Sequence, residues 1–386
     1  MKILHVGVGN LGPGGVATYV DLVTKGLRER GHEVELAELW PAPDLPAATT
    51  MTFGDIPYLL EYARTHPTDA IHLHSQLPSY DGLPDNCLIT AHEHSAHCPG
   101  GSRYLERPRK ICNRPFGTIG CTLHHFLDRC GSRDPRSMRR RFEVTSRSEL
   151  FRGIWIAPSE YSRRMLALRG IPPARTRFVP NPGPEPKTPA TSDPSGPSRN
   201  SFLFIGRLVP SKGCDVAIRA TATSTDLRLR IVGDGPQRDE LQALARKLGV
   251  LDRVSFQGWQ PRQQVEAELR ASLGLVVPSL WPEPFGLVAL EAFSNGVPVI
   301  ASRAGGLVDI VEPGVNGLLV EPGSVRQLAR AMGDFLEDPS LSDRLGMAGN
   351  RTLADRFALG THLDRLEELY AEASKAGGNP EGRTKP

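Results

Sequence analysis

The sequence predicts an α/β fold made of two doubly wound domains, each with a parallel sheet. Short apolar runs alternate with helical patterns, which is typical of parallel sheets. This alternation begins at residue 2 and begins again at residue 201. The 386 residues also exceed what one hydrophobic core usually organises. We therefore expect an N-terminal domain at 1–183, a linker at 184–200, a C-terminal domain at 201–360, and a closing helix with a disordered tail at 361–386.

The first half opens as a βαβ unit. An apolar strand at 2–8 is followed by a helix at 16–30, which Gly31 ends before a second strand at 32–39. Three further short apolar runs are expected as strands, at 70–74, 87–91 and 155–157. The last of them leads into a helix capped near Ser159.

The second half repeats this pattern after a segment rich in Pro, Ser, Thr and Gly, which predicts an extended linker. The expected strands lie at 201–205, 228–232, 254–257, 274–277, 298–301 and 317–320. Helices are expected at 214–223, at 324–337 and within the amphipathic stretch 341–373. The count predicts a second doubly wound domain.

Composition narrows the class of protein. Hydrophobic residues make up 39%, charged residues 23% and the formal net charge is +3, which is typical of soluble globular chains and does not favour nucleic-acid binding. No run approaches the roughly 18 to 20 apolar residues that span a bilayer. The first apolar run is too short for a signal peptide, and six cysteines without such a signal indicate a reducing compartment. We expect a cytoplasmic protein, with peripheral contact at the inner membrane face left open.

The N-terminal glycines allow several interpretations. Gly7-x-Gly9-x-x-Gly12 satisfies the dinucleotide fingerprint, and Glu33, Glu35 and Glu38 are candidate ribose ligands, which together suggest an NAD-dependent oxidoreductase. The glycines continue through Gly14 and Gly15, so that the helix amides could equally serve any anionic ligand. A tight turn without a ligand is the third interpretation.

Two cations and two carboxylates mark the second half. Arg207 and Lys212 lie between a strand and a helix, where they suit a diphosphate. Glu283 and Glu291 are eight residues apart, on a loop and on the helix that follows it. The loop would present amides of Phe285, Gly286, Leu287 and Val288 to an anion while the carboxylates accept hydrogen bonds from hydroxyls. This combination predicts a phosphorylated, polyhydroxylated ligand.

These segments resemble glycosyltransferase family 4, whose members have the GT-B fold with two Rossmann-like domains facing a cleft. The strongest similarity lies at 206–213, 231–236 and 278–322, and weaker similarity lies at 12–20, 69–75, 90–93, 158–162 and 180–183. The resemblance thus touches most of the chain.

The resemblance implies a role for each matching residue. Arg207 and Lys212 would hold the donor diphosphate, and Glu291 the ribose hydroxyls. Glu283 and the amides from Phe285 to Val288 would hold the transferred sugar and its phosphate. The remaining implied positions are an opposing loop at Gly14 and Gly15, a histidine that faces the donor sugar at His92, and a hinge at Asn181. His94 and His97 lie close enough to His92 in sequence to be confused with it.

The implied chemistry is retaining transfer of a hexose from a nucleotide-diphosphate sugar to an acceptor hydroxyl. The leaving diphosphate would take the acceptor proton, with Arg207 and Lys212 stabilising its charge. No Asp-x-Asp sequence occurs, so we expect no divalent metal and no cofactor. UDP is the default base, with GDP and dTDP open, and the acceptor is a small molecule or a lipid-linked one. A non-catalytic nucleotide-sugar-binding protein and a phosphorylase or sucrose-synthase-like reaction remain alternatives.

An insertion at about 94–152 follows His92 and suggests an acceptor-binding loop. It carries four cysteines and four histidines that could form a zinc site, although no Cys-x2-Cys pair supports one: Cys98, Cys112, Cys121, Cys130, His94, His97, His124 and His125. Arg136, Arg139, Arg140 and Arg141 open a predicted helix there. This helix presents either a surface for anionic lipid or a phosphorylated acceptor, or an ordinary solvated face.

Overall fold

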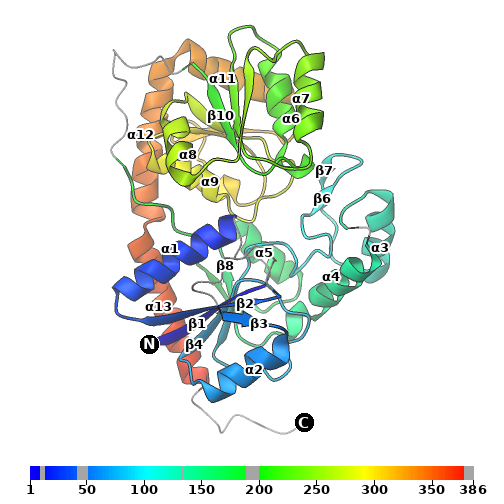
Figure 1. Cartoon of the computed structure of the whole chain (residues 1–386), viewed down its shortest axis with the longest axis vertical. Helices are drawn as coiled ribbons and strands as arrows, with labels where there is room; N and C mark the ends of the chain where they lie inside the picture. Colours follow the sequence, from blue (N-terminus) through cyan, green and yellow to red (C-terminus); the bar gives the residue numbers. More distant parts are fainter. Residues whose placement is uncertain (9–13, 41–50, 133, 188–199, 378–386) are drawn as a thin grey trace. The chain divides into compact units, whose positions relative to one another are not determined.

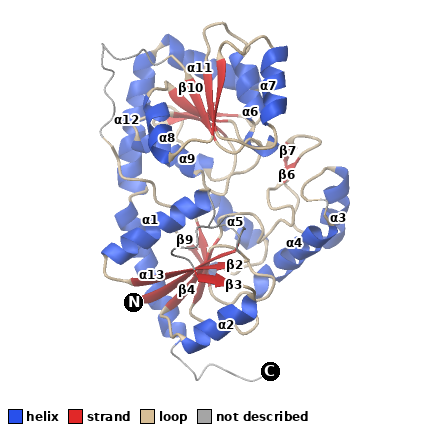
Figure 2. Cartoon of the chain, viewed as in Figure 1, coloured by secondary structure: helices blue, strands red, loops and turns tan. Residues whose placement is uncertain are grey.

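The computed structural model describes residues 1–8, 14–40, 51–132, 134–187 and 200–377. The chain divides into two compact units. Unit 1 comprises 1–103, 113–182 and 359–386, and unit 2 comprises 104–112 and 183–358. Each unit has its own parallel sheet, and Figure 2 shows the strands of each sheet flanked by helices. The predicted α/β class with two doubly wound sheets is confirmed.

Unit 1 is built on a seven-stranded sheet in the order β3-β2-β1-β4-β5-β8-β9. Its strands are β1 Lys2–Val8, β2 Glu33–Leu39, β3 Met51–Phe53, β4 Ala70–Leu73, β5 Cys87–Thr90, β8 Ile154–Ala157 and β9 Thr176–Phe178. The strand order reverses between β1 and β4, and the carboxyl ends beside such a reversal are where doubly wound sheets bind ligands.

Three helices of unit 1 begin at short polar residues that accept backbone hydrogen bonds. Asp55 caps α2, Asp134 caps α4, and Ser159 caps α5 as predicted, its hydroxyl accepting from the Ser162 amide. The helices are α1 Gly15–Glu29, α2 Ile56–Thr65, α3 Thr118–Leu127, α4 Pro135–Arg147, α5 Glu160–Leu168 and α13 Leu359–Gly377. Figure 1 shows α13, in red, beside α1 and β4. The C-terminal helix therefore packs against the sheet of unit 1, far from it in sequence.

Unit 2 has a six-stranded sheet in the order β12-β11-β10-β13-β14-β15, which reverses between β10 and β13. Its strands are β10 Phe202–Ile205, β11 Leu229–Val232, β12 Val254–Gly258, β13 Gly274–Val277, β14 Val299–Ser302 and β15 Gly317–Val320. Along β10, Phe202 and Phe204 belong to one hydrophobic cluster and Leu203 to another. Successive side chains of a strand point to opposite faces, so each face of the sheet has its own core.

Helices cover both faces of this sheet. Those of the first cluster are α6 Cys214–Thr221, α7 Arg238–Lys247 and α11 Val325–Glu337; those of the second are α8 Arg262–Arg270, α9 Leu287–Ser294 and α10 Leu307–Ile310. The last helix, α12 Pro339–Arg356, contributes to both clusters.

Two features differ from the sequence-based organisation. The expected helices of 341–373 are α12 and α13, which separate where the chain leaves unit 2 after Ala358, next to the buried Phe357. The closing helix thus begins at 359 and packs in unit 1. Within the insertion 94–152, the hairpin of β6 Tyr104–Leu105 and β7 Lys110–Ile111 groups with unit 2, because Tyr104 joins its core.

Some predictions fall outside the described residues. They are most of the linker 184–200, namely 188–199, and the end of the tail, 378–386. Within the described residues, every helix is too short or too polar to cross a bilayer.

Candidate functional site

Lys212, Ser279 and Glu283 form a polar cluster in unit 2, on the loops that follow β10 and β13. Lys212 Nζ lies 2.7 Å from Glu283 Oε1, and the Ser279 hydroxyl donates to the same oxygen at 2.6 Å. Only 6% of Glu283 is exposed. The Lys212 ammonium also lies 4.9 Å from the centre of the Trp281 ring. The structure thus brings together two of the predicted site residues, Lys212 and Glu283, at the carboxyl ends of the two strands beside the reversal.

Two glycines permit the close backbone packing of this cluster. Gly213 has φ +68°, and a Cβ there would lie 2.0 Å from the Pro278 carbonyl oxygen. Gly305 has φ +62°, and a Cβ there would lie 2.1 Å from the Glu283 carbonyl oxygen. Any larger residue would displace the loops, because such contacts are far inside van der Waals distance. The loop that carries Glu283 is thus fixed by neighbours on both sides.

Helix α9 begins directly after this loop, with Gly286 as its N-cap. The first amides of a helix have no acceptor within the helix and carry the positive end of its dipole. The predicted amide donors of Leu287 and Val288 are in that first turn. The Phe285 ring packs edge-on against Phe357 at 5.8 Å and is buried, so that only its backbone can serve a ligand.

Glu291 and Arg207, the other two charged residues predicted for the site, differ in their surroundings. Glu291 lies about one turn into α9, where burial raises the pKa of its carboxyl above the usual range. Arg207 follows β10 and is exposed. The contacts among the described residues join Lys212, and not Arg207, to Glu283.

His92 is the predicted site residue of unit 1 with the most defined surroundings. It follows β5, and its Nε2 lies 3.2 Å from Nδ1 of His74. The Tyr19 ring packs edge-on against it, with centroids 4.7 Å apart. Burial lowers the pKa of His92 to about 3, which makes its imidazole neutral at neutral pH. A neutral imidazole has one donor nitrogen and one acceptor nitrogen.

His94 and His97 are distinct from this arrangement. His94 Nδ1 lies 3.1 Å from His97 Nε2, and the His94 ring packs edge-on against Tyr161. His92 contacts His74 and Tyr19, whereas His94 contacts His97 and Tyr161, so the two histidines lie in different surroundings. That His92 faces a donor sugar stays a prediction.

Gly14 and Gly15 begin α1, with Gly14 as its N-cap and both residues exposed. The Thr18 amide and hydroxyl donate to the Gly14 carbonyl at 3.0 and 3.1 Å. Gly9 and Gly12 of the fingerprint lie outside the described residues. The acidic residues proposed for a dinucleotide ribose are used otherwise, because Glu33 and Glu35 pair with Lys2 at 3.7 and 3.3 Å.

The proposed zinc site in the insertion lacks a converging ligand set. The cysteines of the insertion are divided between the units, because Cys112 belongs to unit 2 while the other three belong to unit 1. Cys130 Sγ lies 3.9 Å from His125 Nδ1, and the His94 and His97 rings approach each other separately. Across the described ranges, the one group of His, Cys, Asp or Glu side chains close enough to share a metal is His5, His72 and His74.

Sequence reasoning missed these three buried histidines. His5 in β1 and His72 in β4 are register partners, and His74 comes one residue after β4 ends. Two histidines spaced by one residue in an otherwise apolar run were the available signal, because residues i and i+2 of a strand share a face.

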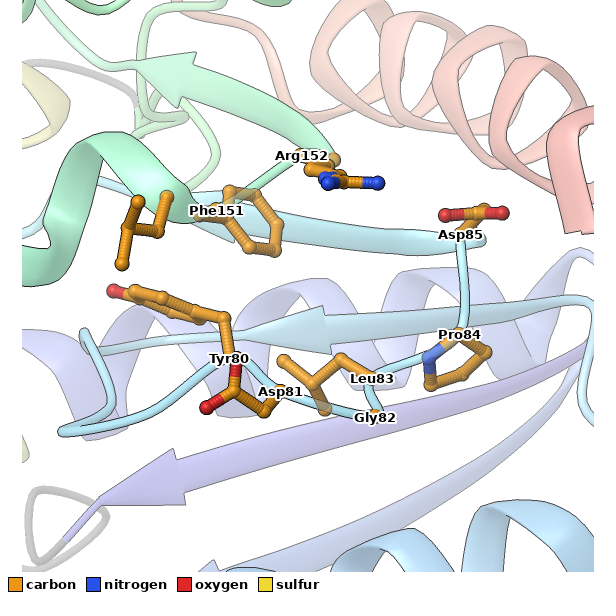
Figure 3. A pocket seen from close by; sticks show the side chains of 10 residues that line it. Tyr80, Asp81, Gly82, Leu83, Pro84, Asp85, Phe151 and Arg152 are labelled. Carbon is orange, nitrogen blue, oxygen red and sulfur yellow. The ribbon is translucent and has the colours of Figure 1, made fainter. Parts of the chain in front are cut away.

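Figure 3 shows a pocket of unit 1. It lies at the amino ends of β5 and β8, whereas His92 follows the carboxyl end of β5. It is lined by 80–85, before β5, and 150–153, before β8. Arg152 and Asp85 lie along one side of it (Figure 3). None of the predicted site residues lines it, and ligands of doubly wound sheets bind at the carboxyl edge instead.

Both halves of the chain match family models. Residues 13–182 match the model described as Glycosyltransferase Family 4, and residues 192–352 match the model described as Glycosyl transferases group 1. A D-inositol 3-phosphate glycosyltransferase of Thermobispora bispora is 37% identical over 235 residues, which are 55% of this chain and 54% of the relative. The chain spans about half the length of the curated relatives it matches.

Solved structures with the same fold cover nearly the whole chain. Sucrose-phosphate synthase from Thermosynechococcus elongatus superposes with a TM-score of 0.75 at 23% identity, covering 97% of this chain and 99% of its own. The Anabaena protein Alr3699/HepE, solved in complex with UDP, superposes with a TM-score of 0.70 at 21% identity, covering 96% and 100%. With two family models matched in succession and this fold, the chain belongs to the family 4 type of GT-B glycosyltransferases.

Proposed function

We propose that the protein is a retaining glycosyltransferase that moves a hexose from a nucleotide-diphosphate sugar to an acceptor hydroxyl. The observation that carries the proposal is the Lys212, Ser279 and Glu283 cluster, which precedes the N-terminus of α9. A cation and helix amides suit the diphosphate, and a buried carboxylate suits sugar hydroxyls. UDP is the proposed base, supported by the UDP complex of a protein with the same fold.

The proposed reaction balances without a metal. The bond between the sugar C1 and the diphosphate oxygen breaks, and a bond from the acceptor oxygen to C1 forms on the same face. The acceptor proton passes to the leaving diphosphate. Lys212 and Arg207 would stabilise the negative charge that develops there, as preorganised electrostatic contributions to the transition state. His92 would face the donor sugar.

Ligand-dependent thermal stability tests the donor first, because a ligand that binds the native state raises its melting temperature. The full-length protein is screened with UDP, GDP, dTDP and NAD, each with and without EDTA. Stabilisation by one nucleoside diphosphate that EDTA leaves unchanged would support the proposal and name the base. Stabilisation by NAD alone, or loss of stabilisation with EDTA, would contradict it.

Turnover and product stereochemistry test the reaction itself. Hydrolysis or transfer from the donor sugar named by the screen is followed, and NMR of the product reports its anomeric configuration. Retention supports the proposed mechanism and inversion rules it out. Binding of the donor without any release of nucleoside diphosphate would instead favour the non-catalytic nucleotide-sugar-binding alternative.

We also propose that α3 contacts an anionic lipid surface, which would suit a lipid-linked acceptor. Its exposed apolar side chains lie at a helical spacing that places them on one face: Ile119 87%, Leu123 54%, Phe126 55% and Leu127 50% exposed. Helix α4 follows with four exposed arginines, at 136, 139, 140 and 141. The Phe142 ring of α4 packs against His125 of α3, at 6.3 Å. An apolar face beside basic side chains is typical of interfacial helices.

Vesicle flotation tests this contact. The protein should float with phosphatidylglycerol vesicles and not with pure phosphatidylcholine. The double variant Leu123→Ser with Phe126→Ser should lose flotation, whereas Leu168→Ser, a 75% exposed leucine of α5, should keep it. Flotation that the double variant retains, or that is equal for both lipids, would reject the contact.

A further inference from the structure

A continuous chain of hydrogen bonds runs through the interior of unit 1 and ends at His92. Its members come from β1, α1, β4, β5 and α13 and from the loops after β4, β5 and β9. In order they are the Pro180 carbonyl, His362, Tyr19, Thr90, His72, Tyr370, His5, His74 and His92. Each side chain between the two ends is hydrogen-bonded to the member before it and to the member after it, so the direction of one bond constrains the next.

The Pro180 end fixes the direction. A carbonyl oxygen only accepts, so His362 Nδ1, 2.8 Å away, must carry the proton and donate. Burial lowers the pKa of His362 to about 4, and in the neutral ring Nε2 is then the acceptor. The Tyr19 hydroxyl lies 3.0 Å from that nitrogen and must donate its single proton to it. Tyr19 can therefore only accept from its other partner.

That other partner is Thr90: burial raises the pKa of Tyr19, and a hydrogen bond from the Thr90 hydroxyl acts in the opposite direction. The Thr90 proton goes to Tyr19, so that the Thr90 oxygen accepts from His72 Nε2 at 2.7 Å. His72, neutral in its buried position, keeps a lone pair on Nδ1. This nitrogen accepts from the Tyr370 hydroxyl, 2.8 Å away.

The same rule carries the direction from Tyr370 to His92. Having donated to His72, Tyr370 accepts from His5 Nε2 at 3.3 Å. His5 Nδ1 then accepts from His74 Nε2 at 2.9 Å, and His74 Nδ1 accepts from His92 Nε2 at 3.2 Å. The last bond requires that His92 carry its proton on Nε2.

We infer that this relay sets the tautomer of His92, so that Nδ1, the ring nitrogen not bound to His74, presents a lone pair. His92 would then accept a hydrogen bond from a hydroxyl of the donor sugar and would not donate one. The inference rests on the proposed function for the identity of that hydroxyl, but the tautomer itself does not. Tyr370 and His362, from the C-terminal helix, act as positioning residues for a histidine near residue 90.

The relay also accounts for the close approach of His5, His72 and His74 in a way that requires no metal. All six ring nitrogens of the three residues already have a partner among Thr90, Tyr370, His92 and one another. A metal ion would replace at least three of these hydrogen bonds. Metal analysis of the purified protein should therefore find no stoichiometric zinc, copper, nickel or iron, and a stoichiometric metal lost on His5→Gln substitution would overturn the relay.

The tautomer can be read directly from the protein. In protein labelled with ¹⁵N-histidine, long-range ¹H–¹⁵N correlation spectra distinguish a protonated ring nitrogen from a bare one, and His92→Gln assigns the resonance. The expected result is a neutral His92 with its proton on Nε2. A proton on Nδ1 in the wild-type protein would overturn the inferred direction.

Tyr370→Phe breaks the relay at its centre without changing side-chain volume much. It should give His92 a mixture of tautomers and lower kcat about ten-fold, less than the loss expected for removing an acid–base group outright, while the nucleotide Kd stays the same. Tyr62→Phe is the matched control, because its hydroxyl bonds to Glu35, outside the relay. If His92 keeps one tautomer in Tyr370→Phe and kcat is unchanged, the inference is wrong.

A second pair of variants, at Thr90, tests the relay independently in case Tyr370→Phe does not fold. Thr90→Val removes a relay hydroxyl and should mix the tautomers, whereas Thr90→Ser should preserve the Nε2 form. Failure of the two proposals is distinguishable, because the predicted tautomer without glycosyl transfer would contradict only the proposed function. If the protein transfers sugar but its His92 tautomer is unchanged in both Tyr370→Phe and Thr90→Val, only the relay would be contradicted.

Discussion

The two units differ most sharply in their use of histidine. All eleven histidines of the chain lie in the ranges of unit 1, and the ranges of unit 2 contain none. In unit 1, burial lowers the pKa of six of them: His5, His72, His74, His92, His97 and His362. In unit 2, the candidate site depends on a lysine and a carboxylate, Lys212 and Glu283.

The two candidate sites therefore suit ligand groups of different chemistry. A diphosphate is an anion, so a site for it can use fixed charge and helix amides. A neutral sugar hydroxyl needs a hydrogen-bond donor or acceptor of defined orientation. Buried neutral imidazoles and hydroxyls provide one without carrying a net charge. The cost of the second solution is sensitivity to acid, because buried neutral histidines must gain protons when the unit unfolds.

The largest expected effect is therefore acid unfolding of unit 1 before unit 2. The folded state lowers the pKa of each of the six histidines below the ordinary value of 6.5, to about 3 for His5 and His92. At a pH between the two values, each histidine is neutral in the folded state and protonated in the unfolded state. The unfolded state thus gains protons as pH falls below 6.5, and stability is lost in that direction. All six histidines act in the same direction, so unit 1 should lose stability steeply as the pH falls below 6.5.

Hydrogen exchange with mass spectrometry at pH 7.5, 6.5 and 5.5, corrected for intrinsic rates, measures this loss unit by unit. Peptides from β1, β4 and β5 should lose protection steeply, and peptides from β10 and β13 should lose little. Equal loss in both units would show that the histidines do not govern the acid response.

Lys212→Ala should have the next largest effect. Removing the cation should weaken UDP binding by about 10- to 100-fold, the range for a lost hydrogen bond to a charged group, and should lower kcat/KM by about 100-fold or more. Calorimetric titration and donor turnover measure the two losses. Lys247→Ala, at the exposed end of α7 in the same unit, is the control and should behave as wild type. Tight UDP binding by Lys212→Ala would remove the diphosphate from this cluster.

Elements marked by a local sequence pattern were predicted, whereas elements that depend on pairing between distant segments were missed. Lys2–Val8 and Gly274–Val277 were predicted with the observed bounds, because uninterrupted apolar runs mark buried parallel strands. Met51–Phe53 and Thr176–Phe178 were missed, since three residues carry little pattern and depend on pairing with β2 and β8. Helix α2 was missed although its capping aspartate, Asp55, was readable.

The candidate sites show the same contrast. Lys212, Glu283 and Glu291 lie in local motifs, so their spacing alone pointed to a phosphorylated ligand, and the structure joins the first two. The relay behind His92 has no such local motif. It needs the register that places His5 beside His72 and a helix that begins at residue 359, neither of which is visible as a sequence pattern.

Glu291→Gln should weaken UDP binding by about ten-fold, the effect of one charged hydrogen-bond partner. If the carboxylate accepts from ribose hydroxyls, the substitution should matter less for a deoxyribose nucleotide. Calorimetric Kd values for UDP and 2′-deoxy-UDP and 3′-deoxy-UDP with both proteins complete the comparison. Glu337→Gln, exposed at the end of α11, is the control. An equal loss for all three nucleotides would place Glu291 away from the ribose.

The smallest expected effect concerns the hairpin of β6 and β7. Arg109 Nη2 lies 2.8 and 2.7 Å from the two carboxylate oxygens of Asp215 in α6, but 46% of the Arg109 side chain is exposed. Solvent screens such a pair, so a double-mutant cycle of Arg109→Ala and Asp215→Ala should give a coupling of only about 0.5 kcal/mol. Denaturant unfolding followed by hydrogen exchange in α6 measures it.

Because Tyr104 is buried in the core of unit 2, Tyr104→Ala should cost more, about 3 kcal/mol. A coupling larger than the Tyr104 loss would mean that charge, and not burial, attaches this hairpin to unit 2, and the contrast between the two units would then extend beyond their candidate sites.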